Sequence, residues 1–551
     1  MKKTILLFTL IISCLLSKIS DAQAPDWQWA KSAGGLEADV AHSVAVDGAG
    51  NVYVTGRFYS HILTFGTQTL INKDNTGNTT DLFLAKYDAN GNVLWAKSAG
   101  ENHSNESVLS LAVDTSGNIY TTGAFGGPTI TFDSVILTNG GFFLTKYDTD
   151  GNVLWAKSAS NLNVCQGSSV AVDVSGNAYV GGWYRDSSID FDSISLPNAG
   201  SADLLLVKYD TGGNMIWAKG FGGTNYDLAH AVAVDTSGNI YVTGEFGSPT
   251  LVLDTITLTK TGTDSSDIFL AKLNTNGDVL WARKAGGAGN DMANSVAVDG
   301  KLGIVYITGT FTSPTMSIGP NVLVNAGSDD LFLAKYDTDG NAIWAKSAGG
   351  PSDDVAYSVA IDTLGNALIT GFIQSSTITF GNTTLTDKGI FLTKYSKLGN
   401  VLWTKASGFR STDAAESVVV DVFGNIYLTG CFLSTNISFD NFTLTNAGGG
   451  GCDIFLAKLG ITTGIFETAD PSNLSLFPNP TPNYITIENY NIANKSFTLT
   501  LMNIQGQLLL TEKVELDKTH TLDLSKFPNG IYFLNLQNEK ENYTSKVVVQ
   551  R

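Results

Sequence analysis

Hydrophobic and polar residues alternate along most of the chain, within a block of roughly 62 residues that recurs seven times. In the second block, the alternating segments are Ser110–Asp114, Ile119–Gly123, Phe142–Asp148 and Asn152–Lys157. Gly, Asn and Asp separate these segments. Period-two alternation bounded by such turn residues predicts four antiparallel strands per block. No segment shows a helical period of comparable strength, so we expect an all-β fold.

Three residues mark each block at fixed places. The Trp series is Trp29, Trp95, Trp155, Trp217, Trp281, Trp344 and Trp403. The Asp series is Asp47, Asp114, Asp173, Asp235, Asp299, Asp362 and Asp421. The Lys series is Lys86, Lys146, Lys208, Lys272, Lys335, Lys394 and Lys458.

The two ends of the array are out of phase. Each Lys is followed about nine residues later by a Trp, except Lys458, and Trp29 is the Trp that has no preceding Lys. A displaced piece at each end is what a circular array needs to hide its sheet edges. We therefore expect Trp27–Ser32 to be the outer strand of the sheet whose other strands come from Ser417–Leu459.

Residue size changes with strand order. The first strand of each block is rich in Ser, Ala and Val, whereas the third and fourth carry Phe, Leu, Tyr and Trp. Small side chains suit strands that converge on an axis, and large ones fill the outer wedge between sheets. This favours a seven-bladed β-propeller over residues 25–460, closed by an N-terminal outer strand. Between the second and third strands, segments such as Ile378–Leu385 and Ile437–Leu444 predict an extra small hairpin per blade.

The repeated units also resemble a known family. The patterns D-x-x-G-N-x-Y-V-T-G and D-x-F-L-A-K-Y-D-x-x-G-N-x-x-W are similar to the bacterial SBBP repeats, and the likeness covers about Trp27 to Leu459. The resemblance implies a seven-bladed propeller. It supplies no catalytic residue, because the family carries no agreed chemistry.

A different pattern begins near Leu474. Residues 461–473 form a polar linker, and residues 474–551 contain short alternating strands that predict a small β-sandwich. The succession of motifs is similar to the type A sorting domain of type IX secretion, with matches at Pro478, Asn479, Pro480, Gly506, Gly530 and Lys546. The resemblance implies that the type IX secretion machinery is a partner. It also implies export across the outer membrane, removal of this domain, and release or attachment to surface lipopolysaccharide.

The first 22 residues are expected to be a signal peptide, with Lys2 and Lys3 before a short apolar run. No other stretch approaches the length of a membrane-spanning helix. The formal charge of −18 argues against a nucleic-acid partner, which requires clustered basic residues. We therefore expect a secreted or cell-surface monomer.

Candidate chemistry is sparse. Asp148-Thr149-Asp150-Gly151 and Asp337-Thr338-Asp339-Gly340 look like partial calcium loops but lack the further oxygen ligands, so we expect Asx turns and neither metal nor cofactor. No catalytic residue is predicted, because His is nearly absent and no HExxH, nucleophile elbow or Walker loop occurs. A sialidase-like use of Arg57, Arg185 and Arg410 lacks the sequence boxes of that class.

The remaining hypothesis is a binding, adhesion or scaffold module, with a secreted enzyme acting on polysaccharide or glycan as the alternative. Acidic residues recur in the loop before the first strand, near the expected channel mouth. They could line a site for a glycan or protein ligand, or serve as local loop caps; these residues are Asp39, Asp227, Asp291, Asp354 and Asp413.

Three cysteines follow the signal peptide. Cys431 ends the second strand of the last block and Cys452 begins the third, so antiparallel pairing brings them opposite each other. A disulfide between them is expected in an exported protein. Cys165 has no predicted partner.

Overall fold

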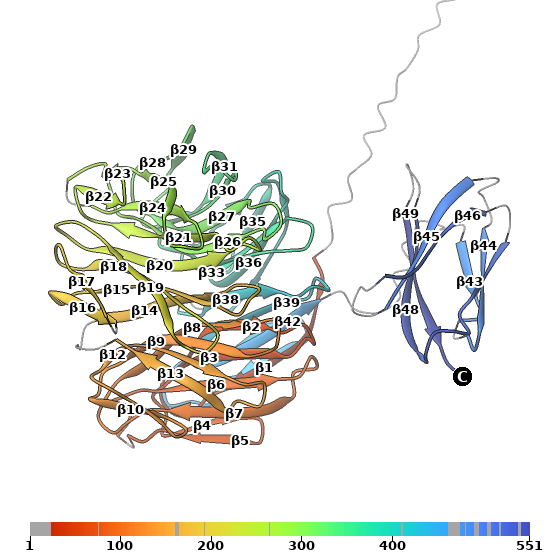
Figure 1. The fold of residues 1–551 in the computed structure, drawn as a ribbon, viewed down its shortest axis with the longest axis horizontal. Helices are drawn as coiled ribbons and strands as arrows, with labels where there is room; N and C mark the ends of the chain where they lie inside the picture. The colour runs from red at the N-terminus through yellow and green to blue at the C-terminus, as the bar shows by residue number, and fades with distance from the viewer. Residues whose placement is uncertain are drawn as a thin grey trace, which may run out of the picture. The chain divides into compact units, whose positions relative to one another are not determined.

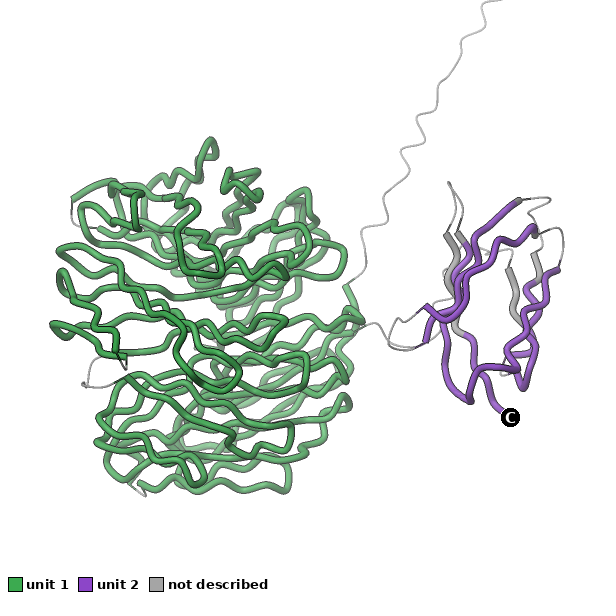
Figure 2. The backbone as a smooth tube through the Cα atoms, viewed as in Figure 1, with its two compact units in different colours: residues 1–462 green, residues 463–551 purple. Residues whose placement is uncertain are grey.

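Antiparallel β-strands make up the secondary structure of the described chain, and none of its residues is helical. The computed structural model describes residues 24–74, 76–159, 165–191, 193–263, 265–408, 412–460, 474–479, 481–489, 495–503, 508–516, 519–537 and 542–551. The chain divides into two compact units, Met1–Thr462 and Thr463–Arg551 (Figure 2). The expected signal peptide (residues 1–22) and linker (residues 461–473) lie outside the described residues.

Seven sheets of the first unit repeat one strand order, first to fourth, among the described residues. Sheet 1 contains β2 (Asp39–Val46), β3 (Val52–Phe58), β6 (Asp81–Tyr87) and β7 (Val93–Ala99). Sheet 2 contains β8 (Glu106–Val113), β9 (Ile119–Phe125), β12 (Gly141–Tyr147) and β13 (Val153–Ser158). Sheet 3 contains β14 (Cys165–Val172), β15 (Ala178–Tyr184), β18 (Asp203–Tyr209) and β19 (Met215–Phe221).

The next three sheets follow the same order. Sheet 4 contains β20 (Asp227–Val234), β21 (Ile240–Phe246), β24 (Asp267–Leu273) and β25 (Val279–Gly286). Sheet 5 contains β26 (Asp291–Val298), β27 (Val305–Phe311), β30 (Asp330–Tyr336) and β31 (Ala342–Ala348). Sheet 6 contains β32 (Asp354–Ile361), β33 (Ala367–Ile373), β36 (Gly389–Tyr395) and β37 (Val401–Ser407).

Sheet 7 combines the two ends of the array. Its strands are β38 (Ala414–Val420), β39 (Ile426–Phe432), β42 (Asp453–Gly460) and, as the fourth strand, β1 (Asp26–Ala33). β1 runs antiparallel to β42, with Ala30 opposite Ala457. The expected pairing of the segment around Trp29 with the strand that carries Lys458 is therefore confirmed. Figure 1 shows β39 and β42 from late in the unit beside β1 from its start.

A two-stranded hairpin follows the second strand of every sheet, as the sequence predicts. The hairpins are β4–β5 (Ile62–Phe65, Gln68–Ile71), β10–β11 (Thr129–Phe132, Val135–Thr138), β16–β17 (Ser188–Phe191, Ile194–Pro197), β22–β23 (Thr250–Leu253, Ile256–Thr259), β28–β29 (Thr315–Ile318, Asn321–Val324), β34–β35 (Ile378–Phe380, Thr383–Leu385) and β40–β41 (Asn436–Phe439, Phe442–Thr445). β28 also bonds to β25, which extends sheet 4 to six strands.

Apolar residues form cores between neighbouring sheets. In sheet 1, all seven residues of β6 are buried, whereas the outer strand β7 keeps exposed positions. One core joins Trp29, Ile454 and Leu456 of sheet 7 to Val54 and Phe58 of sheet 1. Each first strand contacts the first strand of the next sheet, and β38 of sheet 7 contacts β2 of sheet 1. The apolar face of each sheet is therefore buried against the neighbouring sheet.

The second unit contains two antiparallel sheets. One has the order β43 (Leu474–Phe477), β44 (Tyr484–Asn489), β47 (Thr519–Asp523). The other has the order β46 (Leu508–Leu516), β45 (Lys495–Asn503), β48 (Gly530–Gln537), β49 (Asn542–Val549). Ile485 and Leu522 of the first sheet share one apolar core with Leu499, Leu534 and Val547 of the second.

Candidate functional site

Serine hydroxyls join the first strands of neighbouring sheets. At six junctions between described first strands, a Ser Oγ accepts a hydrogen bond from a backbone N–H of the next sheet, over 3.1–3.3 Å. The pairs are Ser43–Leu111, Ser110–Val170, Ser169–Val232, Ser295–Val359, Ser358–Val418 and Ser417–Val44. In sheet 4, Ala231 stands at this position and has no hydroxyl. The last pair joins sheet 7 to sheet 1, a junction that we call the seam.

The recurrent Trp and Lys contact the turn between the third and fourth strands of the next sheet. Six indoles donate to a carbonyl oxygen there: Trp29–Ala89, Trp95–Thr149, Trp155–Thr211, Trp217–Thr275, Trp281–Thr338 and Trp344–Lys397. Five ammonium groups donate to the same oxygens: Lys458–Ala89, Lys86–Thr149, Lys146–Thr211, Lys208–Thr275 and Lys335–Lys397. These contacts connect sheets, so both series stabilise the frame.

The D-x-x-G-N segments form Asx turns. Asp148 Oδ1 accepts the backbone N–H groups of Asp150 (2.9 Å) and Asn152 (2.8 Å), and its Oδ2 accepts the Asn152 amide. Gly151 has φ 78°, a conformation that glycine adopts without strain. Asp337 repeats this pattern with Asp339 and Asn341. Within the described residues, no three His, Cys, Asp or Glu side chains are grouped to hold a metal ion.

The five acidic residues expected near a ligand are loop caps. Asp39, Asp227, Asp291, Asp354 and Asp413 are each 0% exposed. Each carboxylate accepts a backbone N–H from the loop after the second strand of its own sheet, from Ser60, Ser248, Ser313, Ser375 and Ser434 respectively. These bonds give the carboxylates the second of the two roles expected for them, that of loop caps, and a part in a ligand site stays a prediction.

A second buried carboxyl stands beside four of these caps. This second carboxyl is the first residue of the third strand in the preceding sheet. With the cap named first, the pairs are Asp39–Asp453, Asp227–Asp203, Asp291–Asp267 and Asp354–Asp330. Glu106 of sheet 2 and Asp81 of sheet 1 form the equivalent pair. Burial and the neighbouring charge raise the pKa of Asp39 and Glu106 to about 7.

Glycine pairs fit between these carboxyls. A Cβ on Gly222 would lie 2.1 Å from Asp203 Oδ1, and the next residue, Gly223, donates its N–H to Asp227 over 2.8 Å. Gly286 and Gly287 repeat this arrangement with Asp267 and Asp291. The recurrent Gly-Gly sequence is thus explained by close packing against a carboxyl.

One position of the first strand varies between the sheets, and only His occurs there twice. A β-bulge interrupts the pairing of the first and second strands in all seven sheets. The unpaired residues, which we call the bulge residues, are His42, Leu109, Ser168, His230, Asn294, Tyr357 and Glu416. All are partly exposed, whereas their neighbours in the strand are mostly Ala, Ser and Val. A repeated frame therefore presents seven side chains of six chemical types where the first strands meet.

Two bulge residues at the seam, His42 and Glu416, lie within the electrostatic influence of Arg57 of β3. Burial, with a contribution from the Arg57 charge, lowers the pKa of His42 to about 3, so this imidazole is neutral at pH 7. Burial raises the pKa of Glu416 to about 7, and the Arg57 charge opposes that shift. His42 Nε2 and Arg57 Nε are buried and have no hydrogen-bond partner among the described residues. Tyr357 packs against Phe372, with ring centroids 5.6 Å apart.

A second polar group lies in sheets 3 and 4. His230 Nε2 is 3.4 Å from Glu245 Oε1. Burial opposes ionisation of Glu245, but its hydrogen bond and charge interaction with His230 lower its pKa. In sheet 3, the Arg185 guanidinium lies 5.1 Å from the centre of the Trp183 ring. Arg410, the third arginine of the sialidase-like alternative, lies outside the described residues.

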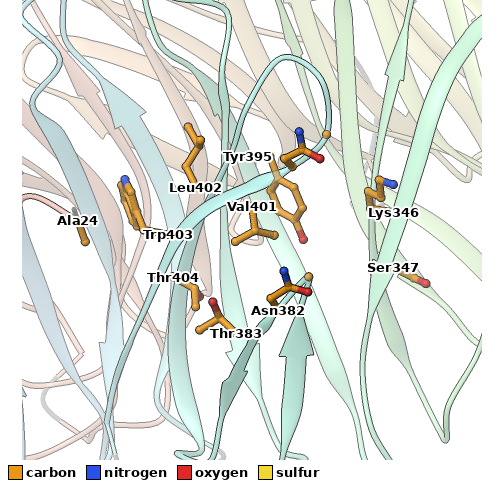
Figure 3. Close-up of a pocket in the computed structure, with 13 residues that line it drawn as sticks. Ala24, Lys346, Ser347, Asn382, Thr383, Tyr395, Val401, Leu402, Trp403 and Thr404 are labelled. Atoms are coloured by element: carbon orange, nitrogen blue, oxygen red, sulfur yellow. The ribbon is translucent and has the colours of Figure 1, made fainter. Parts of the chain in front are cut away.

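A pocket also lies at the outer edge of sheets 5 and 6, apart from the bulge residues. Figure 3 shows Trp403, Asn382 and Lys346 among its lining residues, with Ala24 beside the indole. Each of the six other indoles of the series packs closely against a glycine of the next sheet, as Trp344 packs against Gly399. No glycine of the described chain packs against Trp403 in this way. The third and fourth strands of sheet 7 come from opposite ends of the unit, so no short turn with a glycine joins them. The pocket beside Trp403 therefore lies where the other sheets place this turn.

The expected disulfide is not formed in the structure, in which Cys431, Cys452 and Cys165 are free thiols. The Cys431 and Cys452 side chains are nevertheless hydrogen-bonded to each other, although the register partner of Cys431 is Ile454 and Cys452 lies just before β42. Their hydrogen bond raises the pKa of Cys431 and lowers that of Cys452. Cys165 is buried, and its Sγ accepts the Phe142 N–H at 3.2 Å. The disulfide remains a prediction.

The residues of the expected sorting motif lie in the second unit. Asn479 Oδ1 accepts the Val548 N–H at 2.8 Å, so the segment that follows β43 is fixed to β49. Pro478 precedes Asn479, Gly530 begins β48, and Lys546 lies in β49. Pro480 and Gly506 lie outside the described residues.

The sequence analysis missed the bulge residues, Arg57 in its relation to Glu416, and the carboxyl pairs. One signal was available for the first group. When the seven blocks are aligned on the Asp series, the residue five positions before the Asp varies freely between conserved small neighbours, as His42 does before Asp47. The carboxyl pairs join different blocks, so no pattern within one block reveals them.

Two known families match this chain, one in the repeats of the first unit and one in the second unit. The Beta-propeller repeat family, SBBP, matches residues 28–57 and 216–245. The Secretion system C-terminal sorting domain matches residues 475–550. The chain thus carries SBBP propeller repeats and a type IX sorting domain, which marks proteins exported to the cell surface or the extracellular space. No helix of the described chain is long and apolar enough to cross a membrane.

Curated relatives share part of their length with this chain. An uncharacterized WD repeat-containing protein of Acanthamoeba polyphaga mimivirus is 24% identical over 511 residues, which are 75% of this chain and 36% of the relative. Regulatory protein FlaEY of Caulobacter vibrioides is 28% identical over 284 residues, 48% of this chain and 29% of the relative. The chain thus spans about a third of the length of these relatives.

Solved structures show weak overall likeness. Sqt1 from Chaetomium thermophilum has a TM-score of 0.37 at 10% identity, covering 77% of this chain and 85% of that one. A structural genomics protein of unknown function from Bacteroides thetaiotaomicron has a TM-score of 0.29 at 10% identity, covering 78% and 98%. Neither score supports an argument about fold or function.

Proposed function

We propose that the seven sheets are the blades of a closed β-propeller over residues 25–460, with β1 as the closing strand. Three contacts support closure at the seam: the pairing of β1 with β42, the bond from Val44 N–H to Ser417 Oγ, and the contact of β38 with β2. The Trp29 and Lys458 bonds to Ala89 repeat there the contacts that join the other sheets. In a closed propeller, the bulge residues face a central channel.

The propeller acts as an exported binding module, and its ligand site is the channel at the bulge residues. The observation that carries this proposal is the contrast between a frame with one repeated set of bonds and six different residue types among the seven side chains at one position of that frame. Packing alone would favour one residue type at equivalent positions, whereas recognition of an asymmetric ligand requires different groups. His42 Nε2 and Arg57 Nε are buried there without a hydrogen-bond partner among the residues that the structure describes, which supports a polar ligand.

The sorting domain delivers this module to its place of action. We propose that residues 474–551 engage the type IX secretion machinery, that residues 461–473 link the two units, and that the sorting domain is removed after export. The propeller then remains as a released or surface-attached monomer.

Ligand capture by the wild-type chain and by a channel variant tests the binding role. Glu416→Gln removes the negative charge with little change of volume, and Leu154→Ala, at a 50% exposed position of β13, is the matched control. The proposal predicts that an immobilised chain retains surface glycans or peptides from a defined library, and that only Glu416→Gln changes the retained set. The same retained set for all three proteins would contradict it.

Glycan hydrolysis is the second candidate function. Glu416 and Glu245 are carboxyls of sheets 7 and 4 whose pKa values are shifted in opposite directions. Such a division suits a general acid and an ionised partner. Release of reducing sugar from a polysaccharide, lost in Glu416→Gln, would establish this candidate, and binding without release would exclude it for that polysaccharide.

A further inference from the structure

We propose that the ligand at the bulge residues is a neutral glycan, held at the seam by Arg57 and Glu416 against the Tyr357–Phe372 pair. This inference rests on the proposed binding function and adds the chemical class of the ligand. Three neighbouring sheets supply the subsite: sheet 1 with His42 and Arg57, sheet 6 with Tyr357 and Phe372, and sheet 7 with Glu416.

The charges of the subsite select against ionic ligands. Arg57 is a permanent cation, and Glu416, whose pKa is raised to about 7, is an anion within the electrostatic influence of Arg57 above that pH. An anionic ligand would meet Glu416 as well as Arg57, on a chain of net charge −18. A cationic ligand would meet Arg57. A neutral ligand leaves the opposite charges of Arg57 and Glu416 compensated. It accepts hydrogen bonds from Arg57 and donates them to Glu416.

The hydrogen-bonding groups match vicinal hydroxyls. Arg57 provides a planar set of donors, and a Glu416 carboxylate provides two acceptor oxygens. Neutral His42 has one donor and one acceptor nitrogen, and its Nε2 has no partner among the described residues. A sugar hydroxyl both donates and accepts, so adjacent hydroxyls on one ring can satisfy all three side chains. A ligand with only donors or only acceptors would leave one of them unsatisfied.

Aromatic residues supply the apolar part of the subsite. The Tyr357 and Phe372 rings are both partly exposed and lie at an interplanar angle of 44°. An aromatic face packs against the C–H face of a pyranose while the ring hydroxyls remain free for polar groups. Trp183 of sheet 3 adds a second, partly exposed aromatic group next to Arg185. Glu245 with His230 repeats the combination of acceptor and donor in sheet 4. The set suits an oligosaccharide that spans more than one subsite.

The recessed position of the polar atoms favours a slender ligand over a protein surface. His42 Nε2 and Arg57 Nε are buried, and the bulge residues are only partly exposed. A flat protein interface requires groups that project to the surface. The end of a saccharide chain can enter a channel and displace water from such groups.

Calorimetric titration of the full chain tests this inference directly. The probes are four neutral oligosaccharides (cellohexaose, maltohexaose, mannohexaose and chitohexaose), an acidic oligogalacturonate, and a peptide array. We expect one or more neutral hexasaccharides to bind, and Arg57→Ala and Glu416→Gln each to weaken binding at least about tenfold, as expected for loss of a charge-assisted hydrogen bond. Asn382→Ala, in the outer pocket of Figure 3, should leave the affinity unchanged.

Other results separate the ligand class from the binding role. Thermal unfolding of each variant shows whether it is folded, and Tyr357→Phe provides a milder change at the same subsite. Binding of peptides alone, sensitive to Glu416→Gln, would overturn the neutral-glycan inference while the binding function stands. Preference for oligogalacturonate would also overturn it. Binding of any probe that is insensitive to every channel variant would overturn both.

Discussion

Trp29 donates its indole N–H to the carbonyl oxygen of Ala89 over 3.2 Å. Trp29 belongs to sheet 7 and Ala89 to the turn that follows β6 of sheet 1, so a residue near the start of the unit completes its last sheet. The same oxygen accepts the Lys458 ammonium at 3.1 Å. Between sheets 1 and 2, Trp95 and Lys86 donate in the same way to the carbonyl oxygen of Thr149. The seam therefore has the same hydrogen bonds as an ordinary junction between neighbouring sheets.

Trp29→Ala is expected to destabilise the first unit strongly. Trp29 is 8% exposed and belongs to the core shared by sheets 7 and 1, so its truncation should cost about 3–5 kcal/mol, as for buried Trp in other proteins. Removal of residues 25–33 should destabilise further by exposing the edge of β42. Urea unfolding measures both effects. Leu280→Ala, at a 49% exposed position of β25, is the control and should change the free energy of unfolding by less than about 0.5 kcal/mol.

The unfolding free energy should decrease between pH 5 and pH 8. Burial raises the pKa of Asp39 and Glu106 to about 7 and that of Asp81, Asp227, Asp291, Asp330 and Asp453 to about 6. Because these folded-state pKa values exceed the unfolded value of about 3.9, their stabilising contribution is complete below pH 4 and is lost as pH rises through 6–7.

His42 acts in the opposite direction over part of this range. Its lowered pKa makes its protonation below about pH 6.5 favour the unfolded state, but it is one group against eight carboxyls, the seven named above and Glu416, whose pKa is also raised to about 7. Urea unfolding at pH 5 and pH 8 measures the net slope, and Asp203→Asn, which removes one charge of a pair, should reduce it. Equal stability at the two pH values, or greater stability at pH 8, would contradict the account of the carboxyl pairs.

Oxidised, exported protein should contain a Cys431–Cys452 disulfide. The two thiols are already hydrogen-bonded, and the bond would close a loop of about 20 residues, which corresponds to about 3 kcal/mol of stabilisation. Peptide mapping without reductant identifies the linkage. The buried Cys165 should stay free and serves as the internal reference. Two free thiols at Cys431 and Cys452 in exported protein would refute the prediction.

Deleting residues 474–551 should stop export without unfolding the first unit, because the match to the sorting domain covers residues 475–550 and the two units have separate cores. Fractionation should find the shortened chain in the periplasm, with a melting profile like that of the first unit in the full chain. The intact mass of mature wild-type protein should show loss of the sorting domain. Surface display of the shortened chain would show that the signal for export lies elsewhere.

Local and repeated features could be predicted from the sequence. The strands, the Asx turns, the inserted hairpins and the pairing of the Trp29 segment with the strand of Lys458 all follow from patterns within one block or from the phase of the blocks. The sequence could not separate a ligand-binding from a loop-capping role for the Asp39 series, because a carboxyl in a loop reads the same whether it faces solvent or caps a turn. Arg57 and Glu416 are 359 positions apart, and only the meeting of sheets 1 and 7 brings them under one another's influence.

A cysteine cross-link between β1 and β42 tests the closed propeller most directly. Ala30 and Ala457 are paired in the register of the two strands and contribute to the same core, so Ala30→Cys with Ala457→Cys should form a disulfide once Cys165, Cys431 and Cys452 are replaced by Ala. Mass spectrometry of the non-reduced digest should find the peptides of residues 30 and 457 joined within one chain, in nearly all molecules. Two free thiols, or cross-links only between chains, would show that the first and last repeats are apart and that the array is open.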